Sequence, residues 1–237
     1  MSTSPRPGGD RPAAGPGRIV GLMGRSGHPQ GYHDQPRTDV ARLIPIQAVR
    51  ILDVGCGSGG LGRGLLAEGR AIEMHGVEID AEAAARARAD YGWVVEGDAE
   101  EAPLPAPEGF FDCVVYGDIL EHFVNPGDVL ASHLRHLRPG GWVVASVPNM
   151  RNARVLVRLA LRGRWDYFEA GIADWSHLRF WTSRTFREFL QWHGLEVLRI
   201  DLPPYSRRAK ALRIASFGLL RDFLSFKIYA VARKPAG

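Results

Sequence analysis

The richest chemical signal in the sequence is a glycine-rich turn that follows a short hydrophobic run. Residues 51–60 (ILDVGCGSGG) predict a strand that enters a tight turn and then opens a helix. Glycine lets the backbone turn sharply and approach a ligand closely, which a Cβ atom would block. Gly55, Gly57 and Gly60 match the spacing G-x-G-x-x-G, and Glu78 lies where an acidic side chain would accept hydrogen bonds from a ribose. The turn therefore predicts a nucleotide-binding loop.

Three acidic positions narrow the class of ligand. Asp53 stands two residues before the first glycine, where its carboxylate can meet an amino-acid ammonium group but would repel a pyrophosphate. Asp98 follows the third predicted strand and can accept a hydrogen bond from an adenine amino group. Asp118 opens residues 118–122 (DILEH), directly after the fourth strand. This set disfavours an NAD-dependent dehydrogenase, which the glycine spacing alone leaves open.

Together these segments resemble the pattern of class I S-adenosylmethionine-dependent methyltransferases. The resemblance covers roughly residues 32–200, and within that superfamily the sequence is similar to the ubiquinone-type and natural-product O-methyltransferases, including residues 137–141 (LRPGG). It implies S-adenosyl-L-methionine as cofactor, with the glycine loop around the methionine portion. Many relatives have Asp where Glu78 stands, and both carboxylates can bind a ribose diol. The implied cofactor-binding residues are Asp53, Gly55, Gly57, Gly59, Glu78, Ile79, Asp98, Ala99 and Asp118.

Two histidines are the candidates for a catalytic base. His122 follows the fourth strand, and His177 lies in residues 174–182 (DWSHLRFWT), which resemble an Asp-x-x-His-Leu-Arg-Phe-Phe-Thr segment of a bacterial subset of these enzymes. Each histidine can instead have a structural role. His122 can brace the helix that follows it, and His177 can form a hydrogen bond to the backbone. Asp118 and Glu121 can instead hold the loop. The other histidines show no metal-ligand spacing, so we expect no metal.

The elements around these residues alternate between strands and helices. Strands are predicted at 50–54, 72–78, 93–96, 111–116, 142–147, 195–200 and 227–232. Helices are predicted at 38–44, with Thr38 or Asp39 as the cap, and at 61–67, 81–91, 126–137, 152–162, 182–192 and 207–226. This alternation predicts an α/β fold, a Rossmann-like seven-stranded mostly parallel sheet with helices on both faces and a cap insertion after strand five.

The domain organisation follows from the same pattern. Residues 1–31 are rich in Pro, Gly, Ser and Arg and predict a disordered tail, which leaves residues 32–237 as a single methyltransferase domain. Residues 149–182 form the predicted cap insertion, which leaves the carboxyl end of strand five and should cover the acceptor. Residues 203–226 form a second, helical insertion. The aromatic residues of the cap (Trp165, Tyr167, Phe168, Trp175 and Trp181) suit either the wall of an acceptor pocket or a small core of the insertion itself.

The charge distribution bears on the partner. The net charge is +4, and residues 151–237 contain 17 basic and 7 acidic side chains. Such a field attracts anions, although a solvated helix face explains it equally well. We expect a small-molecule acceptor, which can be anionic, and we leave open a homodimer with residues 207–226 at the contact. An RNA methyltransferase and a catalytically silent cofactor-binding partner stay as alternatives.

Further features bear on location and acceptor. No N-terminal stretch has the pattern of a secretory signal and no apolar run approaches about 20 residues, so we expect a cytoplasmic protein without a transmembrane segment. Residues 202–205 (LPPY) resemble the signature of nucleobase amino-methylating enzymes, but they follow strand six instead of strand four. Nucleic acid is therefore disfavoured, and we expect O-methylation in secondary-metabolite, sugar or quinone-type biosynthesis.

Overall fold

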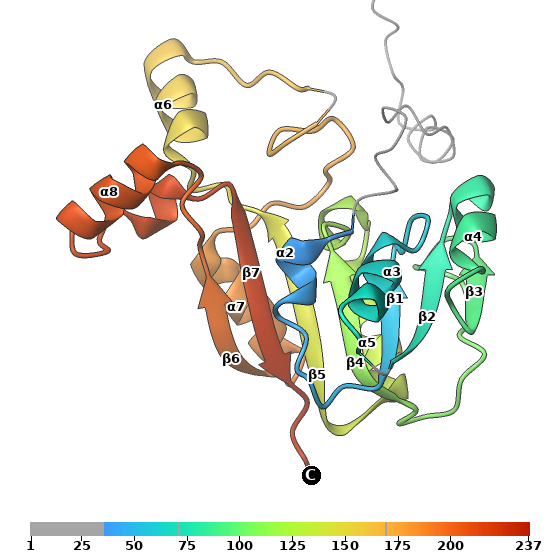
Figure 1. Ribbon diagram of the computed structural model, residues 1–237. Coiled ribbons are helices and arrows are strands. Elements are labelled where there is room, and N and C mark those ends of the chain that lie inside the picture. Colours follow the sequence, from blue (N-terminus) through green and yellow to red (C-terminus); the bar gives the residue numbers. More distant parts are fainter. Residues whose placement is uncertain (1–35, 71, 169) are drawn as a thin grey trace, which may run out of the picture.

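The computed structural model describes residues 36–237 except 71 and 169, so the predicted tail at 1–31 lies outside the described residues. A seven-stranded sheet runs through this part of the chain in the order β3-β2-β1-β4-β5-β7-β6 (Figure 1). Strands β1 to β5 are parallel, whereas β7 is antiparallel to both of its neighbours. This is the Rossmann-like, mostly parallel sheet that the alternation of elements predicts.

The element bounds follow the predicted order closely. The strands are β1 (Arg50–Val54), β2 (Glu73–Glu78), β3 (Trp93–Glu96), β4 (Phe111–Gly117), β5 (Leu137–Pro148), β6 (Glu196–Asp201) and β7 (Lys227–Arg233). The helices are α2 (Thr38–Ala41), α3 (Gly60–Ala67), α4 (Ala81–Ala87), α5 (Pro126–His136), α6 (Ala153–Arg162), α7 (Ser183–Trp192) and α8 (Arg207–Ala215). Two 3-10 helices, η2 (Leu120–His122) and η3 (Arg221–Leu224), complete these elements.

Each face of the sheet has its own hydrophobic core. Helices α2, α3 and α4 pack on one face, and α5 and α7 pack on the other. Neighbouring residues of a strand enter opposite cores, as Ile51 and Leu52 do in β1 and Val115 and Val114 do in β4. A strand that is buried on both faces is apolar throughout instead of alternating, which explains the continuous hydrophobic runs of the sequence.

The predicted cap of the first helix is wrong. Thr38 and Asp39 lie inside α2, and Arg37 occupies the N-cap position with a left-handed φ of 45° and no side-chain cap. Asp39 accepts hydrogen bonds from Arg37 Nε at 3.3 Å and from the Tyr229 hydroxyl at 2.9 Å. The side chain that would have capped the helix therefore joins it to β7.

The predicted helix at 207–226 is also divided. Helix α8 ends at Ala215, and η3 begins only at Arg221. Between them Phe217 and Gly218 adopt φ angles of 50° and 81°, a conformation that ends a helix. Strand β5 begins five residues before the predicted 142, because Leu137 pairs with Phe111 of β4.

The segment after β5 leaves the sheet at the carboxyl ends of the parallel strands. Figure 1 shows α6 (yellow) and the loop after it above these ends, with α8 beside α6. The buried amides of Asn149 and Asn152 both donate to the carbonyl oxygen of Ser225, at 3.0 and 2.9 Å. These bonds join the start of the predicted cap to the start of β7. Across residues 36–237, apart from the two masked positions, no helix has both the length and the apolar character needed to span a bilayer.

Candidate functional site

The glycine loop between β1 and α3 has a shape that requires glycine. Gly55, Gly57 and Gly59 adopt φ angles of 72°, 53° and 82°, which side chains with a Cβ atom rarely enter. The amides of Gly55 and Cys56 donate to the carbonyl oxygen of Val77 at 2.9 and 3.1 Å. The loop is therefore joined to the end of β2 and lies at the carboxyl edge of the sheet.

Glu78, at the end of β2, holds this loop through its side chain. Its carboxylate is buried. Oε2 accepts a hydrogen bond from the Gly57 amide at 2.8 Å, and Oε1 accepts one from the Asp80 amide at 2.9 Å. Each carboxylate oxygen has two lone pairs, so both oxygens can accept a further donor. The predicted ribose contact is compatible with this second, structural role.

Asp53 carries a buried carboxylate behind the loop. Its Oδ2 accepts a hydrogen bond from the Tyr91 hydroxyl at 2.8 Å, and the same hydroxyl oxygen accepts one from the Gly62 amide at 3.3 Å. Burial raises the pKa of the Asp53 carboxyl to about 7, although the Tyr91 bond and the charge of Arg37 act in the opposite direction. A cation beside Asp53 would stabilise its ionised form.

Two further candidates follow the ends of neighbouring strands: Ile79 follows β2, and Asp98 follows β3. These two strand ends lie side by side because the strands pair in parallel. Ile79 is 47% exposed, which is high for an isoleucine. Asp98 Oδ1 accepts a hydrogen bond from the Glu100 amide at 2.9 Å, and Ala99 between them is half-buried. An exposed apolar side chain near an acidic one suits a flat ring with a polar edge.

Asp118 is the centre of an ionic network at the end of β4. Its Oδ1 accepts a hydrogen bond from Ser146 Oγ at 2.8 Å, and its Oδ2 accepts from Arg37 Nη2 at 3.0 Å and Lys227 Nζ at 2.6 Å. Lys227 begins β7, and because β7 is antiparallel its first residue lies at the same edge. Asp118 thus fixes the segment after β4, and its contact with a cofactor stays a prediction.

The segment after β4 also touches the glycine loop. A Cβ atom placed on Gly55 would lie 3.0 Å from the side chain of Ile119, which follows Asp118. The two segments that the sequence predicts for one site are therefore in direct contact.

Helix η2 carries a glutamate into the interior. Glu121 is 1% exposed, and neither of its carboxylate oxygens has a hydrogen-bond partner among the residues that the structure describes. Burial, followed by the negative charge of Asp118, raises the pKa of the Glu121 carboxyl well above its usual range. The main-chain oxygen of Glu121 accepts from the amides of Leu178 and Arg179 at 2.7 and 3.0 Å. The predicted cap is fastened to the sheet at this residue.

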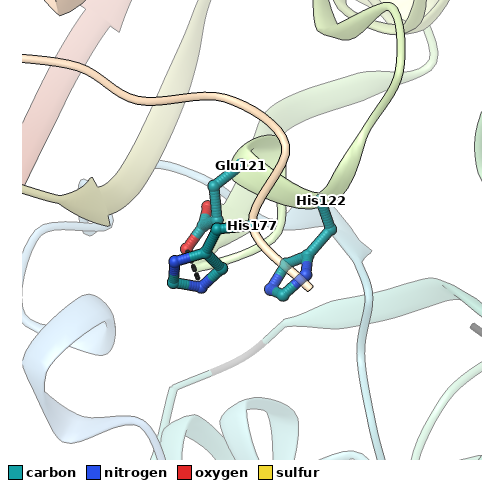
Figure 2. Close-up of side chains that lie close together, drawn as sticks. All are labelled: Glu121, His122 and His177. Atoms are coloured by element: carbon teal, nitrogen blue, oxygen red, sulfur yellow. Dashed lines mark ion pairs between the residues drawn. The ribbon is translucent and has the colours of Figure 1, made fainter. Parts of the chain in front are cut away.

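The two candidate histidines meet beside Glu121. Figure 2 shows His177 and Glu121 directed toward each other, with His122 next to them. Nε2 of His177 lies 3.9 Å from Oε1 of Glu121. The centroids of the His122 and His177 imidazole rings are 4.9 Å apart, in an edge-to-face arrangement. Burial lowers the pKa of the His177 imidazole, although its bond to the backbone of Ile172 raises it. The neutral imidazole is therefore favoured.

A tight turn presents His177. Oδ1 of Asp174 accepts hydrogen bonds from the amide and the hydroxyl of Ser176 at 2.9 and 2.6 Å, and the His177 amide donates to the carbonyl of Asp174 at 3.2 Å. Nδ1 of His177 lies 3.1 Å from the carbonyl oxygen of Ile172. A carbonyl can only accept, so Nδ1 carries the proton and Nε2 keeps its lone pair toward Glu121.

Three residues of the site were not predicted from the sequence: Arg37, Tyr91 and Lys227. Glu121 was expected only to hold the loop after β4. Arg37 and Tyr91 act through contacts distant in sequence, and no local spacing signals them. Lys227 carried a weak signal, because it is a lysine in an arginine-rich chain at the start of an antiparallel strand.

The aromatic residues of the cap do not form one cluster. Trp181 is 8% exposed and contacts Phe186 and Phe189 of α7, so it belongs to a core of the sheet. Tyr167, Phe168 and Trp175 are 59%, 46% and 46% exposed. The two predicted alternatives were a closed aromatic pocket and a separate core of the insertion. Neither describes all of these residues, because Trp181 packs in a core of the sheet and the other three side chains are exposed.

Comparisons with known proteins agree with this geometry. A family described as a methyltransferase domain matches residues 30–200. The ubiquinone biosynthesis O-methyltransferase of Paracidovorax citrulli is 35% identical over 130 residues, which cover 51% of this chain and 52% of that protein. The protein of the same name from Burkholderia thailandensis is 28% identical over 178 residues, or 70% and 73% of the two chains. This chain spans about half the length of the first curated relatives it matches.

Solved structures share the fold. The crystal structure of a SAM-dependent methyltransferase from Archaeoglobus fulgidus superposes with a TM-score of 0.63 at 19% identity, covering 84% of this chain and 95% of the other. The glycine loop, the acidic end of β2 and the segment after β4 therefore occupy a shared architecture. The chain belongs to the class I S-adenosylmethionine-dependent methyltransferases.

Proposed function

We propose that this protein transfers the methyl group of S-adenosylmethionine to a hydroxyl oxygen of a small molecule. The observation that carries the proposal is the contact between the glycine loop and the segment that bears the Glu121–His122–His177 group, through Gly55 and Ile119. This contact puts groups that can handle a proton next to the loop that would hold the cofactor.

The cofactor loop fits S-adenosylmethionine by its chemistry. Asp53 is a buried carboxylate that gains from a cation, and the methionyl ammonium supplies one. Glu78 lies where the ribose diol can donate to its free lone pairs. Ile79, Asp98 and Ala99 provide an apolar surface and an acceptor for adenine. The positive φ angles of the loop glycines let the backbone approach the methionyl portion closely.

The chemistry requires alignment and the removal of one proton. The acceptor oxygen forms a bond to the methyl carbon while the carbon–sulfur bond breaks, leaving S-adenosylhomocysteine. The proton of the acceptor hydroxyl must leave. His177 Nε2 has the lone pair and neutral form that a base needs, and His122 lies beside it. We propose His177 as the base and His122 as the alternative.

The acceptor side supports a small molecule. Residues 171–181 lie over η2 through the bonds of Leu178 and Arg179 to Glu121, which suits a cap. The curated relatives from Paracidovorax citrulli and Thiobacillus denitrificans are named ubiquinone biosynthesis O-methyltransferases, so a hydroxylated aromatic ring is our first acceptor class. Some arginines of the basic half are paired, as Arg151 is with Asp222 and Arg199 with Asp201. The half nevertheless keeps an excess of basic side chains, so an RNA acceptor stays the second candidate.

The test is transfer of a labelled methyl group. The protein is incubated with methyl-labelled S-adenosylmethionine and a panel of catechols and other hydroxylated metabolites, each paired with an analogue whose hydroxyls are already methylated. We expect label in a free-hydroxyl compound and none in its methylated partner. Binding of S-adenosylhomocysteine without transfer to any compound, together with stimulation of another methyltransferase, would replace this proposal with a silent partner subunit. Transfer to RNA alone would replace the acceptor class.

A further inference from the structure

The proposed chemistry does not explain the environment of the Glu121 carboxyl group. Its carboxylate is almost fully buried, yet among the described residues it accepts no hydrogen bond. A buried carboxylate without partners is costly, and it is relieved either by a bound proton or by a cation. Nε2 of the His177 imidazole lies 3.9 Å from Oε1 of Glu121, beyond hydrogen-bond distance. Among the described residues, this buried carboxyl group therefore has no donor.

The positions of three side chains suggest what compensates this carboxylate. Glu121, His122 and His177 each offer one ligand atom, and these atoms all lie within 4.8 Å of one another. Two metal–ligand bonds of about 2.0–2.2 Å span at most about 4.3 Å, so the 3.9 Å between Glu121 and His177 already fits one ion. We propose that Glu121, His122 and His177 form a binding site for a divalent transition-metal ion.

The surroundings of His177 are those of a metal ligand. Nδ1 of His177 donates to the carbonyl of Ile172, which fixes the tautomer, orients the ring and leaves Nε2 free to coordinate. The turn at Asp174 and Ser176 holds this backbone in place. The amides of the next two residues are bonded to the carbonyl of Glu121, so the two ligand-bearing segments are tied together at the site.

The donor set selects the class of ion. Two imidazole nitrogens and one carboxylate oxygen are typical ligands of zinc and related first-row ions, whereas Mg²⁺ and Ca²⁺ prefer sites built from oxygen. Three protein ligands leave a coordination position open, which is the arrangement of catalytic zinc sites. The sequence predicts no metal because the ligands come from two segments, η2 and the cap, with no local spacing between them.

The site deepens the proposed function and in this respect rests on it. A bound divalent cation lowers the pKa of a coordinated oxygen ligand. An acceptor hydroxyl on the open position would release its proton to solvent more easily, and its oxygen would be fixed beside the glycine loop. His122 and His177 would then act as ligands in place of a base.

The binding is tested with the ion alone, without cofactor or acceptor. Metal-free full-length protein is titrated with Co²⁺, whose ligand-field absorption reports coordination by protein, and Zn²⁺ is then added as a competitor. We expect one equivalent of Co²⁺ to bind and Zn²⁺ to displace it, whereas Mg²⁺ does neither. Glu121→Gln and His177→Gln should each weaken binding by at least about 100-fold, since even outer-shell substitutions cost 10- to 100-fold. His136→Gln, at a half-buried histidine outside the group, is the control and should bind as the wild type does.

Thermal unfolding separates a metal ligand from a structural residue. Without metal, Glu121→Gln should have a Tm at least as high as that of the wild type, because the neutral amide replaces a buried carboxyl group that has no partner among the described residues. With excess Zn²⁺ the wild type should gain Tm by mass action and the variant should not.

Two results would overturn the site: less than one equivalent of bound metal in the wild type, or unchanged affinity in both ligand variants. Metal binding that persists while no acceptor is methylated would count against the proposed function and leave the site intact. Full transfer activity of the chelator-treated protein would overturn the role of the ion in the reaction.

Discussion

The two sides of the carboxyl edge are built in different ways. On the cofactor side, from β1 to β4, the carboxylates of Asp53 and Glu78 are buried and held by hydrogen bonds. Glu78 holds Gly57 and Asp80 by their amides, and Asp53 is bonded to Tyr91. These groups have little freedom to move.

On the acceptor side, which comprises residues 149–182 and 203–226, the contacts beyond the buried Asn149 and Asn152 include several at the surface. Helix α6, which the structure describes in full, has no buried residue. Arg151 pairs with Asp222 at 3.0 Å, and Arg154 lies over the ring of Tyr205 at 4.8 Å. Such contacts can be exchanged with little loss of stability.

This difference indicates separate functions for the cofactor side and the acceptor side. The rigid side suits a ligand common to the family, and the loosely attached side suits an acceptor that varies between relatives. The reacting groups lie at the boundary, because Glu121 and His122 come from the first side and His177 from the second. Substitutions should therefore affect cofactor binding strongly on one side and weakly on the other.

The largest expected effect is in the glycine loop. Gly57→Val should abolish binding of S-adenosylhomocysteine, because the side chain fills ligand space and distorts a residue with φ of 53°. Titration calorimetry measures the affinity. Gly163, at the end of α6, has a similar φ of 57°, and a Cβ atom placed there would meet nothing within 4 Å. Gly163→Val should lose stability but keep affinity, and equal loss of affinity in both variants would mean that the loop is misassigned.

The next largest effect is expected on turnover, when a histidine at the boundary between the two sides is replaced. His177→Ala should lower turnover by about 10²–10⁴-fold, the usual contribution of a positioned base, and loss of the proposed ion would act in the same direction. Affinity for S-adenosylhomocysteine should be nearly unchanged. Turnover is measured with the acceptor found by the labelling screen. His122→Ala is the paired variant. If it alone loses activity, the essential histidine belongs to η2, and if both remain active the acceptor ionises without either.

A smaller effect is expected at the end of β2. Glu78→Ala should weaken S-adenosylhomocysteine by about 1.5–3 kcal/mol, the usual contribution of a hydrogen bond to a charged group. Glu78→Asp should be milder, because the charge stays. The affinities are compared by calorimetry, and an alanine variant with wild-type affinity would place the ribose contact on another residue.

The sequence predicts the cofactor side well because its signals are local. The glycines, Asp53 and Glu78 belong to short segments in which strand, turn and helix are contiguous. The structure has β1, α3 and β2 within a residue of their expected bounds, whereas α4 ends at Ala87, four residues before the predicted 91.

The acceptor side and the histidine group were less predictable because they depend on distant contacts. Thr38 has the residue type of a helix cap, yet Arg37 takes that position beside Asp118. The break after Ala215 includes a left-handed turn at Phe217, a residue type that does not favour one, and only Gly218 beside it signals the end of a helix in the sequence. His122 and His177 were expected as separate candidates, and only the tertiary fold brings them to Glu121.

The pH dependence of cofactor affinity follows from Asp53. Its pKa rises from 3.8 to about 7 in the folded protein, so its ionisation is disfavoured there, and the stability gained from the neutral form is lost as pH rises through about 7. A bound ammonium group favours the ionised form. Affinity for S-adenosylhomocysteine should therefore increase with pH up to about 7 and then level off. Calorimetry across this range should show the rise in the wild type and its absence in Asp53→Asn, and a flat wild-type profile would contradict the assignment.

The smallest effect is expected where the acceptor side is attached by charge. Arg151→Ala removes the ion pair with Asp222, and the free energy of unfolding should fall by less than about 1 kcal/mol, as for other partly exposed pairs. Asp222 keeps the hydrogen bond from Ser183 Oγ at 2.8 Å, so its carboxylate is not left without a donor. Affinity for S-adenosylhomocysteine should not change.

Asn149→Ala tests the same attachment from its buried side. The Asn149 amide is fully buried and donates to the carbonyls of Asp222 and Ser225 at 2.6 and 3.0 Å. Its loss removes this donor from the Asp222 carbonyl, at about 1–3 kcal/mol, whereas the Ser225 carbonyl keeps the bond from Asn152. Denaturant unfolding of both variants gives the comparison. If Arg151→Ala is as destabilising as Asn149→Ala, then α6 and η3 depend on the ion pair, and the loosely attached acceptor side is as firmly built as the cofactor side. If the two differ as expected, buried amides fix where the cap leaves the sheet, and the arginines beyond them are free to change with the acceptor.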